Sequence, residues 1–367
     1  MQVKYVDLAK QFRDETLWGS IKQQFKTCQF ILGVDVEHFE SRFADLCSVS
    51  YAVALNSGTD ALFLALKALN IGPNDEVITV PNSFIATAGA IIAVGAKPVF
   101  VDVGRDYNID IKKIEPAITC KTRAVIPVHL TGSPADMTGL MALAKKHDLL
   151  VIEDAAQAVG ASIDGLPVGS FSHVGCFSLH PLKNLNICGD GGILVTNSSE
   201  VASKVRMLRN HGLKNRDEIE FFGYNSRMDT LQAVIALHVL SQLDRITEKR
   251  RENASLYEAE LRTLTAHIKL PPLSDRSVPV YHTFVIRCQK RDALIRFLSE
   301  HQVETKIHYP VPIHLQKPCY ELGYRKGDFP VAERQADEIV SLPIHQHLTK
   351  RQIMYVCGLI KTFYGLN

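Results

Sequence analysis

The chain has 367 residues, 46% of them hydrophobic, and a formal net charge of +2. This length can bury a large core and predicts one large domain with a smaller one beside it. The nearly neutral charge favours neither a nucleic acid nor a membrane surface as a partner.

Eight cysteines are scattered along the chain without a Cys-x-x-Cys pair, and no histidine cluster has the spacing of a zinc site. We therefore expect no metal site, and cysteines that act as small buried hydrophobic residues in a reducing compartment. The N-terminal residues have no apolar signal core, and no uninterrupted apolar run is long enough to span a bilayer. We expect a cytoplasmic protein.

The N-terminal segment has apolar residues at helical spacing over residues 8–25 and again over 36–46. From Tyr51 onward, short apolar runs alternate with helical patterns. This alternation predicts an α/β domain with a mostly parallel sheet that is covered by helices on both faces. The expected strands are residues 52–55, 76–80, 97–101, 124–128, 149–152, 174–178 and 192–196, and the expected helices include residues 59–69, 86–94 and 136–147.

The pattern changes near residues 223–227. A helical stretch over residues 229–261, rich in charges after Asp244, is expected to link the large domain to the C-terminal part. We expect a large domain at residues 1–243 and a smaller α+β domain at residues 244–367. Within the smaller domain the expected elements are a strand around residues 281–286, a helix at 291–301, a strand at 304–309 and a final helix from Lys350.

Lys183 lies on a glycine-containing loop between two expected strands. A lone lysine on a loop is normally a solvated charge, so its surroundings decide its interpretation. Asp154 ends another apolar run, and Ser57, Gly58 and Thr59 stand where a strand ends and a helix begins, which is a ready anion site. A lysine amine, a strand-end carboxylate and a phosphate site together match the needs of pyridoxal 5'-phosphate.

The chain resembles the pyridoxal-phosphate-dependent sugar aminotransferases of the DegT/DnrJ/StrS type, which belong to the aspartate aminotransferase fold superfamily (fold type I). The matching motifs occur in the family's order and span nearly the whole chain. They are residues 56–62, 80–87, 153–157, 177–184, 189–192, 223–228 and 308–310. The resemblance implies a mixed seven-stranded sheet in the large domain.

The resemblance also implies contacts with the cofactor. Asp154 would face the pyridinium nitrogen, Gln157 the ring hydroxyl and Phe84 the flat face of the ring, while Ser178 would donate to the phosphate. Local sequence alone leaves other readings open: a helix cap for Asp154, a core side chain for Phe84 and a turn residue for Ser178. Glu153 is expected to be structural.

A further implication is a homodimer related by a two-fold axis, in which Asn225 reaches the cofactor phosphate of the neighbouring subunit. Arg227 is expected to serve packing or an anionic substrate group. His180 and His308 are candidates to line the site or contact substrate, and His129 has the same standing as His308. Without the resemblance, residues 223–228 read as a turn with a surface arginine, and the histidines read as packing residues.

The implied reaction is a transamination in two halves, with Lys183 as the catalytic base and acid. The amine would come from L-glutamate or L-glutamine and pass to a nucleotide-linked ketosugar. The Gly-Asp-Gly-Gly run at residues 189–192 resembles relatives that aminate C3, whereas those that aminate C4 more often have Gly-Glu-Gly-Gly. We therefore expect a dTDP- or UDP-linked 3-keto sugar, with a 4-keto sugar as the alternative. Departures from the family pattern at Leu182 and at residues 186–188 leave the sugar open.

The same residues bear on three rival functions. A sugar dehydratase of the same family replaces the lysine with histidine, so Lys183 argues against it. A non-catalytic regulatory protein on the same scaffold is a second alternative. The presence of Asp154, Gln157, Ser178 and Lys183 argues against it, because such a protein does not need these residues. A nicotinamide-dependent oxidoreductase would carry a Gly-x-Gly-x-x-Gly turn between a strand and a helix, and the chain has none.

Overall fold

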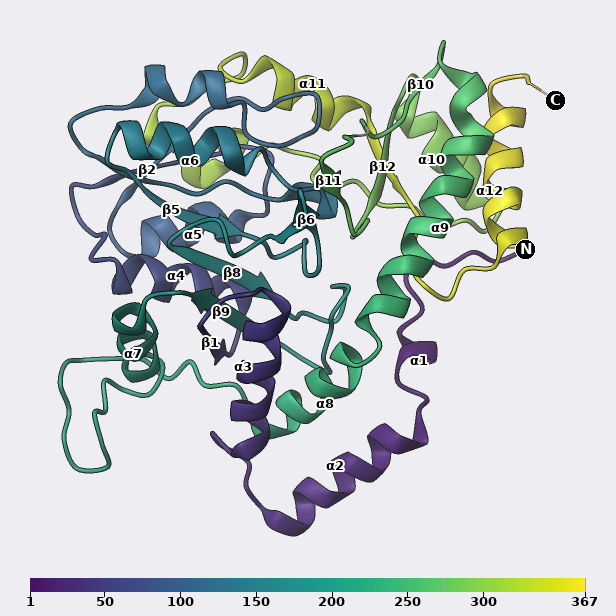
Figure 1. The fold of residues 1–367 in the computed structure, drawn as a ribbon. Coiled ribbons are helices and arrows are strands. Elements are labelled where there is room, and N and C mark those ends of the chain that lie inside the picture. Colours follow the sequence, from purple (N-terminus) through teal and green to yellow (C-terminus); the bar gives the residue numbers. More distant parts are fainter. Residues whose placement is uncertain (273, 367) are drawn as a thin grey trace.

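The computed structural model describes residues 1–272 and 274–366. It is organised around a seven-stranded sheet with the strand order β1-β9-β8-β5-β4-β2-β3 (Figure 1). The strands are β1 (Tyr51–Leu55), β2 (Glu76–Thr79), β3 (Lys97–Phe100), β4 (Thr122–Val125), β5 (Leu150–Asp154), β8 (Val174–Ser178) and β9 (Gly192–Thr196). β9 runs antiparallel to both of its neighbours, and the other neighbouring strands are parallel. The predicted mostly parallel sheet is confirmed.

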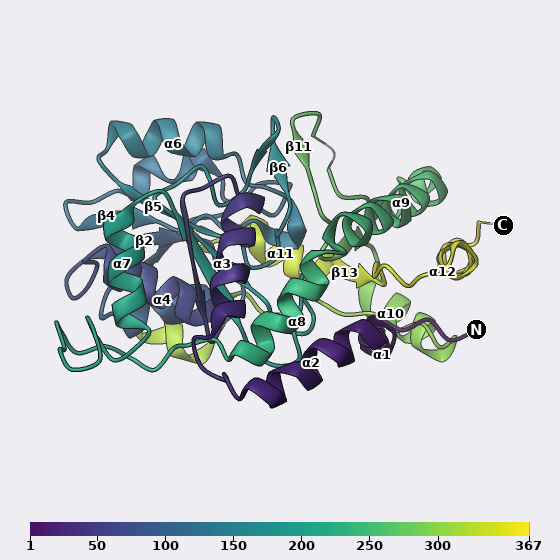
Figure 2. The same cartoon turned by 60° about the horizontal axis from the view of Figure 1, so that its bottom comes forward.

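Helices cover both faces of this sheet because its strands are apolar on both sides. In β9, Ile193 and Val195 pack into the core under one face, and Leu194 packs into the core under the other. The two helix layers are seen in Figure 1 and, after rotation, in Figure 2. One layer contains α4 (Gly58–Ala68), α5 (Ile85–Ala93) and α7 (Ser199–Leu208), and the other contains α3 (Val34–Leu46), α6 (Met137–Lys146) and α8 (Thr230–Leu240).

The prediction of one long helix at residues 229–261 is wrong in one respect, because the stretch forms two helices, α8 and α9 (Leu243–Leu261). At the break, the Ser241 hydroxyl donates to the carbonyl oxygen of His238 at 2.7 Å. Side-chain bonds of this kind compete with the helix backbone and bend it. α9 then runs away from the large sheet towards the C-terminal part (Figure 1).

The C-terminal part contains a three-stranded antiparallel sheet in the order β10-β12-β13. Its strands are β10 (Ile268–Lys269), β12 (Phe284–Cys288) and β13 (Ile339–Leu342). α9, α10 (Arg291–Glu300) and α12 (Lys350–Phe363) build one apolar core with this sheet. Val3, near the N-terminus, belongs to the same core and donates its N–H to the carbonyl oxygen of Gln302 at 2.9 Å.

The strand predicted at residues 304–309 is wrong. Of that stretch only Lys306 pairs with the sheet, through an isolated bridge to Ser341. Val303 packs into the core of the C-terminal part, whereas Ile307 and Tyr309 pack against the core of the large sheet. The alternating apolar residues therefore mark a crossing between two cores and not one strand.

The remaining elements are short strands, helices and turns. The short strands β6 (Ser162–Ile163) and β7 (Leu166–Pro167) form a small sheet with β11 (Ser277–Val278). Phe329, which precedes α11 (Pro330–Glu338), packs into a core of the large sheet. Helices α1 (Leu8–Gln11) and α2 (Glu15–Thr27) follow the N-terminus, and short 3₁₀ turns lie at Ile111–Lys113, Glu115–Ala117, Leu130–Gly132, Arg262–Leu264, Ile313–Leu315 and Lys317–Leu322. The division into residues 1–243 and 244–367 stays a prediction.

Two further sequence expectations can be compared with the structure. Over the described residues, no helix has both the length and the apolar character needed to cross a membrane. None of the eight cysteines is paired, and five are buried, but Cys28, Cys120 and Cys188 are exposed. The expectation that the cysteines are buried is therefore corrected for these three, which lie outside the regular elements of the core.

Candidate active site

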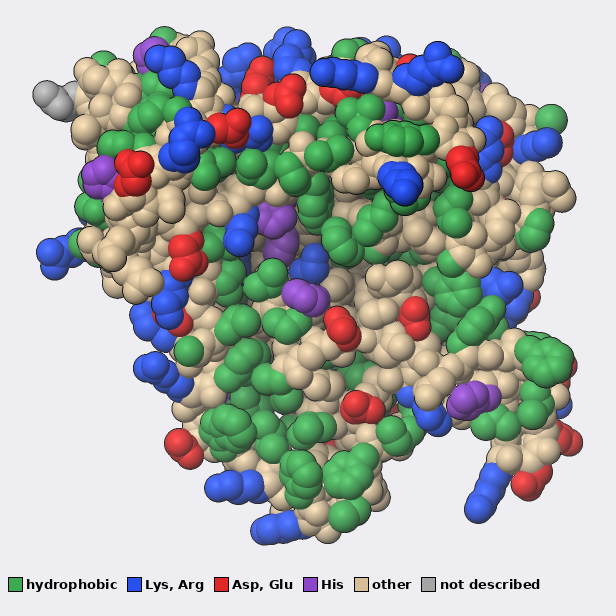
Figure 3. Space-filling model, turned by 180° about the vertical axis from the view of Figure 1, so that it is seen from behind, with side chains coloured by type: hydrophobic (Ala, Val, Ile, Leu, Met, Phe, Trp, Pro, Cys, Tyr) green, Lys and Arg blue, Asp and Glu red, His purple; other side chains and the backbone are tan. Residues whose placement is uncertain are grey.

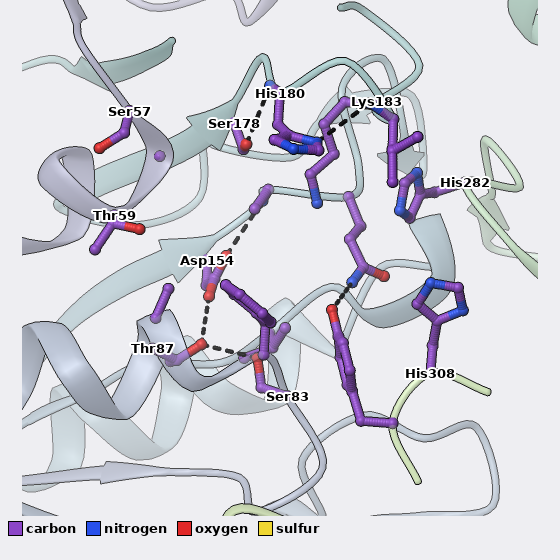
Figure 4. A pocket seen from close by; sticks show the side chains of 18 of the residues that line it. Ser57, Thr59, Ser83, Thr87, Asp154, Ser178, His180, Lys183, His282 and His308 are labelled. Atoms are coloured by element: carbon purple, nitrogen blue, oxygen red, sulfur yellow. Dashed lines mark hydrogen bonds between the residues drawn. The ribbon is translucent and has the colours of Figure 1, made fainter. Parts of the chain in front are cut away.

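A cavity of about 300 Å³ lies where β5 and β8 end and where α4 and α5 begin (Figure 4). The carboxyl edge of a parallel sheet is where α/β proteins usually bind ligands. The cavity brings together most of the predicted site residues, which come from separate segments of the chain. They are Ser57, Gly58, Thr59, Phe84, Asp154, Gln157, Ser178, His180, Lys183 and His308.

The amine of Lys183 projects into this cavity from the loop between β8 and β9 (Figure 4). The backbone N–H of Lys183 donates to the backbone carbonyl oxygen of His180 at 2.8 Å, which fixes the loop locally. Burial lowers the pKa of the amine to about 8, and the Asp154 carboxylate opposes that shift. A lysine with such a pKa reaches its neutral, nucleophilic form far more readily than a solvated lysine does.

The Asp154 carboxylate is buried at the end of β5 and is held by two donors. The Thr87 hydroxyl donates to Oδ2 at 2.7 Å, and the Ala156 N–H donates to Oδ1 at 3.2 Å. Because Thr87 donates to the carboxylate, it accepts from the Ser83 hydroxyl, 2.8 Å away. Burial raises the pKa of Asp154, while these hydrogen bonds and Lys183 act in the opposite direction. Thr87 was not singled out in the sequence; its position in the first turn of α5, four residues after Ser83, was the available signal.

The first turn of α4 lies beside the end of β8 and the start of β9 and has the features of an anion site. Ser57 caps the helix by accepting a hydrogen bond from the Asp60 N–H at 3.1 Å. A Cβ at Gly58 would lie 2.7 Å from the Ser178 Cβ, and a Cβ at Gly192 would lie 2.3 Å from the Ser57 carbonyl carbon. The two glycines thus allow the helix start, Ser178 and β9 to approach each other. The free N–H groups and dipole of a helix start favour a phosphate there.

Two of the predicted ring contacts also lie in the cavity. Phe84 is 54% exposed, and its ring centroid lies 5.8 Å from that of Tyr309. Gln157 is held at both ends of its amide, because Oε1 accepts from the Thr131 N–H at 2.7 Å and Nε2 donates to the Tyr309 hydroxyl at 3.3 Å. An apolar face, an anchored amide, a carboxylate, an amine and an anion site together fit the parts of pyridoxal phosphate. Their individual roles stay predictions.

Other predicted residues lie outside the cavity of their own chain. Asn225 is exposed, and its Oδ1 accepts from the Nε of Arg227 at 3.1 Å. His129 is fully buried; its ring bonds to Glu153 through Nε2 at 3.0 Å, and Nδ1 accepts from the Ala135 N–H at 3.0 Å. Both ring nitrogens of His129 are occupied, so this histidine and Glu153 hold the backbone behind the site and do not face it.

The two remaining predicted histidines differ in exposure. His180 is exposed beside Lys183, whereas the Nδ1 of His308 lies 3.0 Å from the Ser341 hydroxyl. Burial, followed by the charges of Lys183 and Lys306, lowers the pKa of His308 to about 4. His308 is therefore a neutral ring near the amine.

Besides Thr87, sequence reasoning missed the polar cavity residues Tyr5, Arg250, His282 and His345. They come from the N-terminus, from α9 and from the loops beside β12 and β13. Only Arg250 had a readable signal, since its spacing places it on the buried stripe of α9 with Leu243, Ile246, Ala254 and Tyr257.

Comparison with known proteins decides the family. The model of the DegT/DnrJ/EryC1/StrS aminotransferase family matches residues 13–361. The chain belongs to this family. The resemblance predicted from the motifs is thereby confirmed, and the chain is an aminotransferase by family.

Two curated relatives cover nearly the whole chain. A protein of Acidithiobacillus ferrooxidans, named UDP-N-acetyl-3-dehydro-alpha-D-glucosamine 3-aminotransferase, is 45% identical over 99% of this chain and 98% of its own. A protein of Geobacillus stearothermophilus, named pleiotropic regulatory protein, is 41% identical over 99% of both chains.

Solved structures agree with this assignment. DesV of Streptomyces venezuelae superimposes with a TM-score of 0.96 at 40% identity, over 99% of this chain and 98% of DesV. NtdA of Bacillus subtilis, determined with bound cofactor PMP, superimposes with a TM-score of 0.93 at 31% identity, over 99% of this chain and 85% of NtdA. The predicted fold type of the aminotransferases is confirmed.

Proposed function

We propose that this family member is a pyridoxal-phosphate-dependent enzyme that moves an amino group from L-glutamate or L-glutamine to C3 of a UDP- or dTDP-linked keto sugar. The observation that carries the proposal is the Lys183 amine, which shares one cavity with the Asp154 carboxylate and the start of α4. The name of the Acidithiobacillus relative supports amination at C3. So does the Gly-Asp-Gly-Gly run at residues 189–192.

The residues present would hold the cofactor at three points. Lys183 would take the aldehyde carbon, Asp154 the ring nitrogen, and the first turn of α4 with Ser178 the phosphate. When bound, the cofactor supplies an electron sink for the transfer of the amino group. Phe84 would form one apolar wall beside the ring.

The chain itself supplies the proton transfers and the positioning. With a pKa of about 8, the Lys183 amine exchanges between its neutral and protonated forms near neutral pH, so it can take a proton from one carbon and return it to another. Thr87 and Ala156 fix Asp154, which keeps its carboxylate in one orientation during that transfer.

The first test is the visible absorbance of the purified protein before and after L-glutamate is added. We expect a yellow band that shifts to shorter wavelength with the donor and returns with a 3-keto nucleotide sugar; a 4-keto sugar, tested in parallel, distinguishes the alternative substrate. Lys183→Ala should abolish turnover, with thermal unfolding as the control for folding. A protein that stays colourless with added pyridoxal phosphate would refute the proposal and favour the regulatory role for which the Geobacillus relative is named.

We also propose that two copies of the chain complete each other's sites in a cytoplasmic homodimer. Asn225 is exposed and lies outside its own cavity, so it is free to reach another copy. The loop between α7 and α8, which carries Asn225, projects from the body of the molecule, as does α2 (Figure 1). Both segments display apolar side chains, with Phe222 99% exposed and Phe25 60% exposed, which is typical of surfaces that bind a partner. Eight unpaired cysteines agree with a reducing compartment.

A further inference from the structure

Arg250 is a buried cation that lines the same cavity as Lys183. Only 5% of it is exposed, and its Nη1 donates to the carbonyl oxygens of Tyr281 at 2.9 Å and His282 at 3.3 Å. Its Nε is buried without a partner, and within residues 1–272 and 274–366 no carboxylate forms an ion pair with it. Burying a guanidinium without a counter-ion costs free energy, so the binding of a negatively charged ligand in the cavity would be strongly favoured.

Two other polar groups of this wall also have unused hydrogen-bonding capacity. The Tyr5 hydroxyl is buried near Ser341 and has no hydrogen-bond partner among the described residues. The Nδ1 of His282 is buried without a partner as well, and its ring points into the cavity near Lys183 (Figure 4). Native proteins rarely leave several buried polar atoms unsatisfied in one place, so this cluster indicates a binding site.

The charge of this wall is positive. Burial lowers the pKa of His345 to about 4 and that of His282 well below its usual value, and the charge of Arg250 adds to both shifts. These histidines are therefore neutral at physiological pH, and the charges beside them are those of Arg250 and, next to His282, Lys183. Figure 3 shows a hollow in one face of the molecule where histidine and Lys or Arg side chains gather.

The free edge of Arg250 has the shape of a carboxylate site. Because Nη1 is occupied by two carbonyl groups, the edge that remains is formed by Nε and Nη2, which match the two oxygens of one carboxylate. Among the described residues that line the cavity, Arg250 and Lys183 are the only Lys or Arg side chains. A single guanidinium edge suits one carboxylate better than a diphosphate, which several cations usually surround.

We propose that Arg250, assisted by the Tyr5 hydroxyl, binds a carboxylate group of the amino donor. The inference rests on the aminotransferase function proposed above and assigns the donor's place within the cavity. In this arrangement Arg250 positions the donor so that its amino group faces the region of Lys183, and the sugar nucleotide does not use this contact.

The test compares two ligands on the cofactor-loaded protein. Glutarate, a dicarboxylate without an amino group, is titrated by calorimetry, and the two half-reactions are followed by the absorbance of the cofactor. Arg250→Gln should weaken glutarate binding and raise the half-saturating concentration of L-glutamate by about 10- to 100-fold. Arg250→Lys should recover part of the loss. The half-saturating concentration of the keto sugar should stay at the wild-type value.

Because Arg250 also bonds to the backbone, folding is checked through the thermal midpoint and retention of the cofactor, and Tyr5→Phe provides a second probe. This variant removes only a hydroxyl that has no hydrogen-bond partner in the described chain, and it should still weaken the binding of glutarate. Unchanged glutarate binding in folded Arg250→Gln or in Tyr5→Phe would overturn the inference, as would an effect confined to the keto sugar. If the proposed function itself fails, the wild-type spectrum will not respond to any donor, which separates the two failures.

Discussion

The hydrogen bond from Thr87 to Asp154 offers a sharp test of how the chain prepares its site. Thr87→Val replaces the hydroxyl by a methyl group of nearly the same size and removes the shorter of the two hydrogen bonds that Asp154 accepts, at 2.7 Å against 3.2 Å. A hydrogen bond to a charged group contributes about 1.5–3 kcal/mol. Since the lost hydrogen bond favours the ionised form, the pKa of Asp154, already raised by burial, should rise further in the variant.

A carboxylate that ionises less readily is a weaker partner for a protonated ring nitrogen. We therefore expect Thr87→Val to weaken the binding of pyridoxal phosphate by about 10- to 100-fold. The measurement is an absorbance titration of the cofactor-free protein, repeated at several pH values. Thr87→Ser retains the hydroxyl and should bind nearly as the wild type does. If Val and Ser variants bind the cofactor equally well, the hydroxyl does not control Asp154 and the reasoning is refuted.

Three further outcomes are expected. Gly192→Ala places a Cβ 2.3 Å from the backbone of Ser57, so this variant should bind pyridoxal phosphate with less preference over pyridoxal than the wild type does. Gly358→Ala is the control, because its Cβ meets nothing within 4 Å. An equal preference in both variants would contradict a phosphate site at the start of α4. The pKa of Lys183 in the folded protein is lowered to about 8, so above that pH the unfolded chain binds more protons than the folded one. The free energy of unfolding of the cofactor-free protein should therefore increase as pH rises from about 8 towards the ordinary lysine pKa. In denaturant titrations Lys183→Met should lose this increase with pH, and the same increase in both proteins would refute the pKa shift. Mixing inactive Lys183→Ala chains with inactive Asn225→Asp chains should restore activity, because the mixed dimer contains one intact site; no recovery in a proven mixed dimer would show that Asn225 serves its own chain.

The parts of the site that could be predicted are those in which neighbouring residues carry the signal. Asp154 follows an apolar strand, and Gly58 stands at the turn from a strand into a helix, so their positions at the edge of the sheet follow from local pattern. Lys183 was found because its flanking motifs occur in a fixed order. The hydrogen bond from Thr87 to Asp154 depends on how β5 meets α5, which no local pattern gives.

The errors share a physical origin in contacts between distant segments. Residues 304–309 alternate as a strand does, but their apolar side chains are divided between two cores. The spacing of Arg250 in α9 indicates that it is buried, but its place in the site depends on loops that follow it in the chain. The role predicted for Asn225 is not among these errors; it involves a second copy of the chain and stays a prediction.

The contacts of the first few residues affect how the protein is made in the cell. The Tyr5 N–H donates to Glu304 at 2.9 Å, and the Lys4 carbonyl lies 3.2 Å from the ring of His345. Ribosomes add about 5–20 residues per second, so these early residues wait on the order of 15–60 s for the segments that hold them. During synthesis Tyr5 therefore has no partner until the chain has reached Glu304, and a nascent chain stalled before that residue would leave the cavity open on that side.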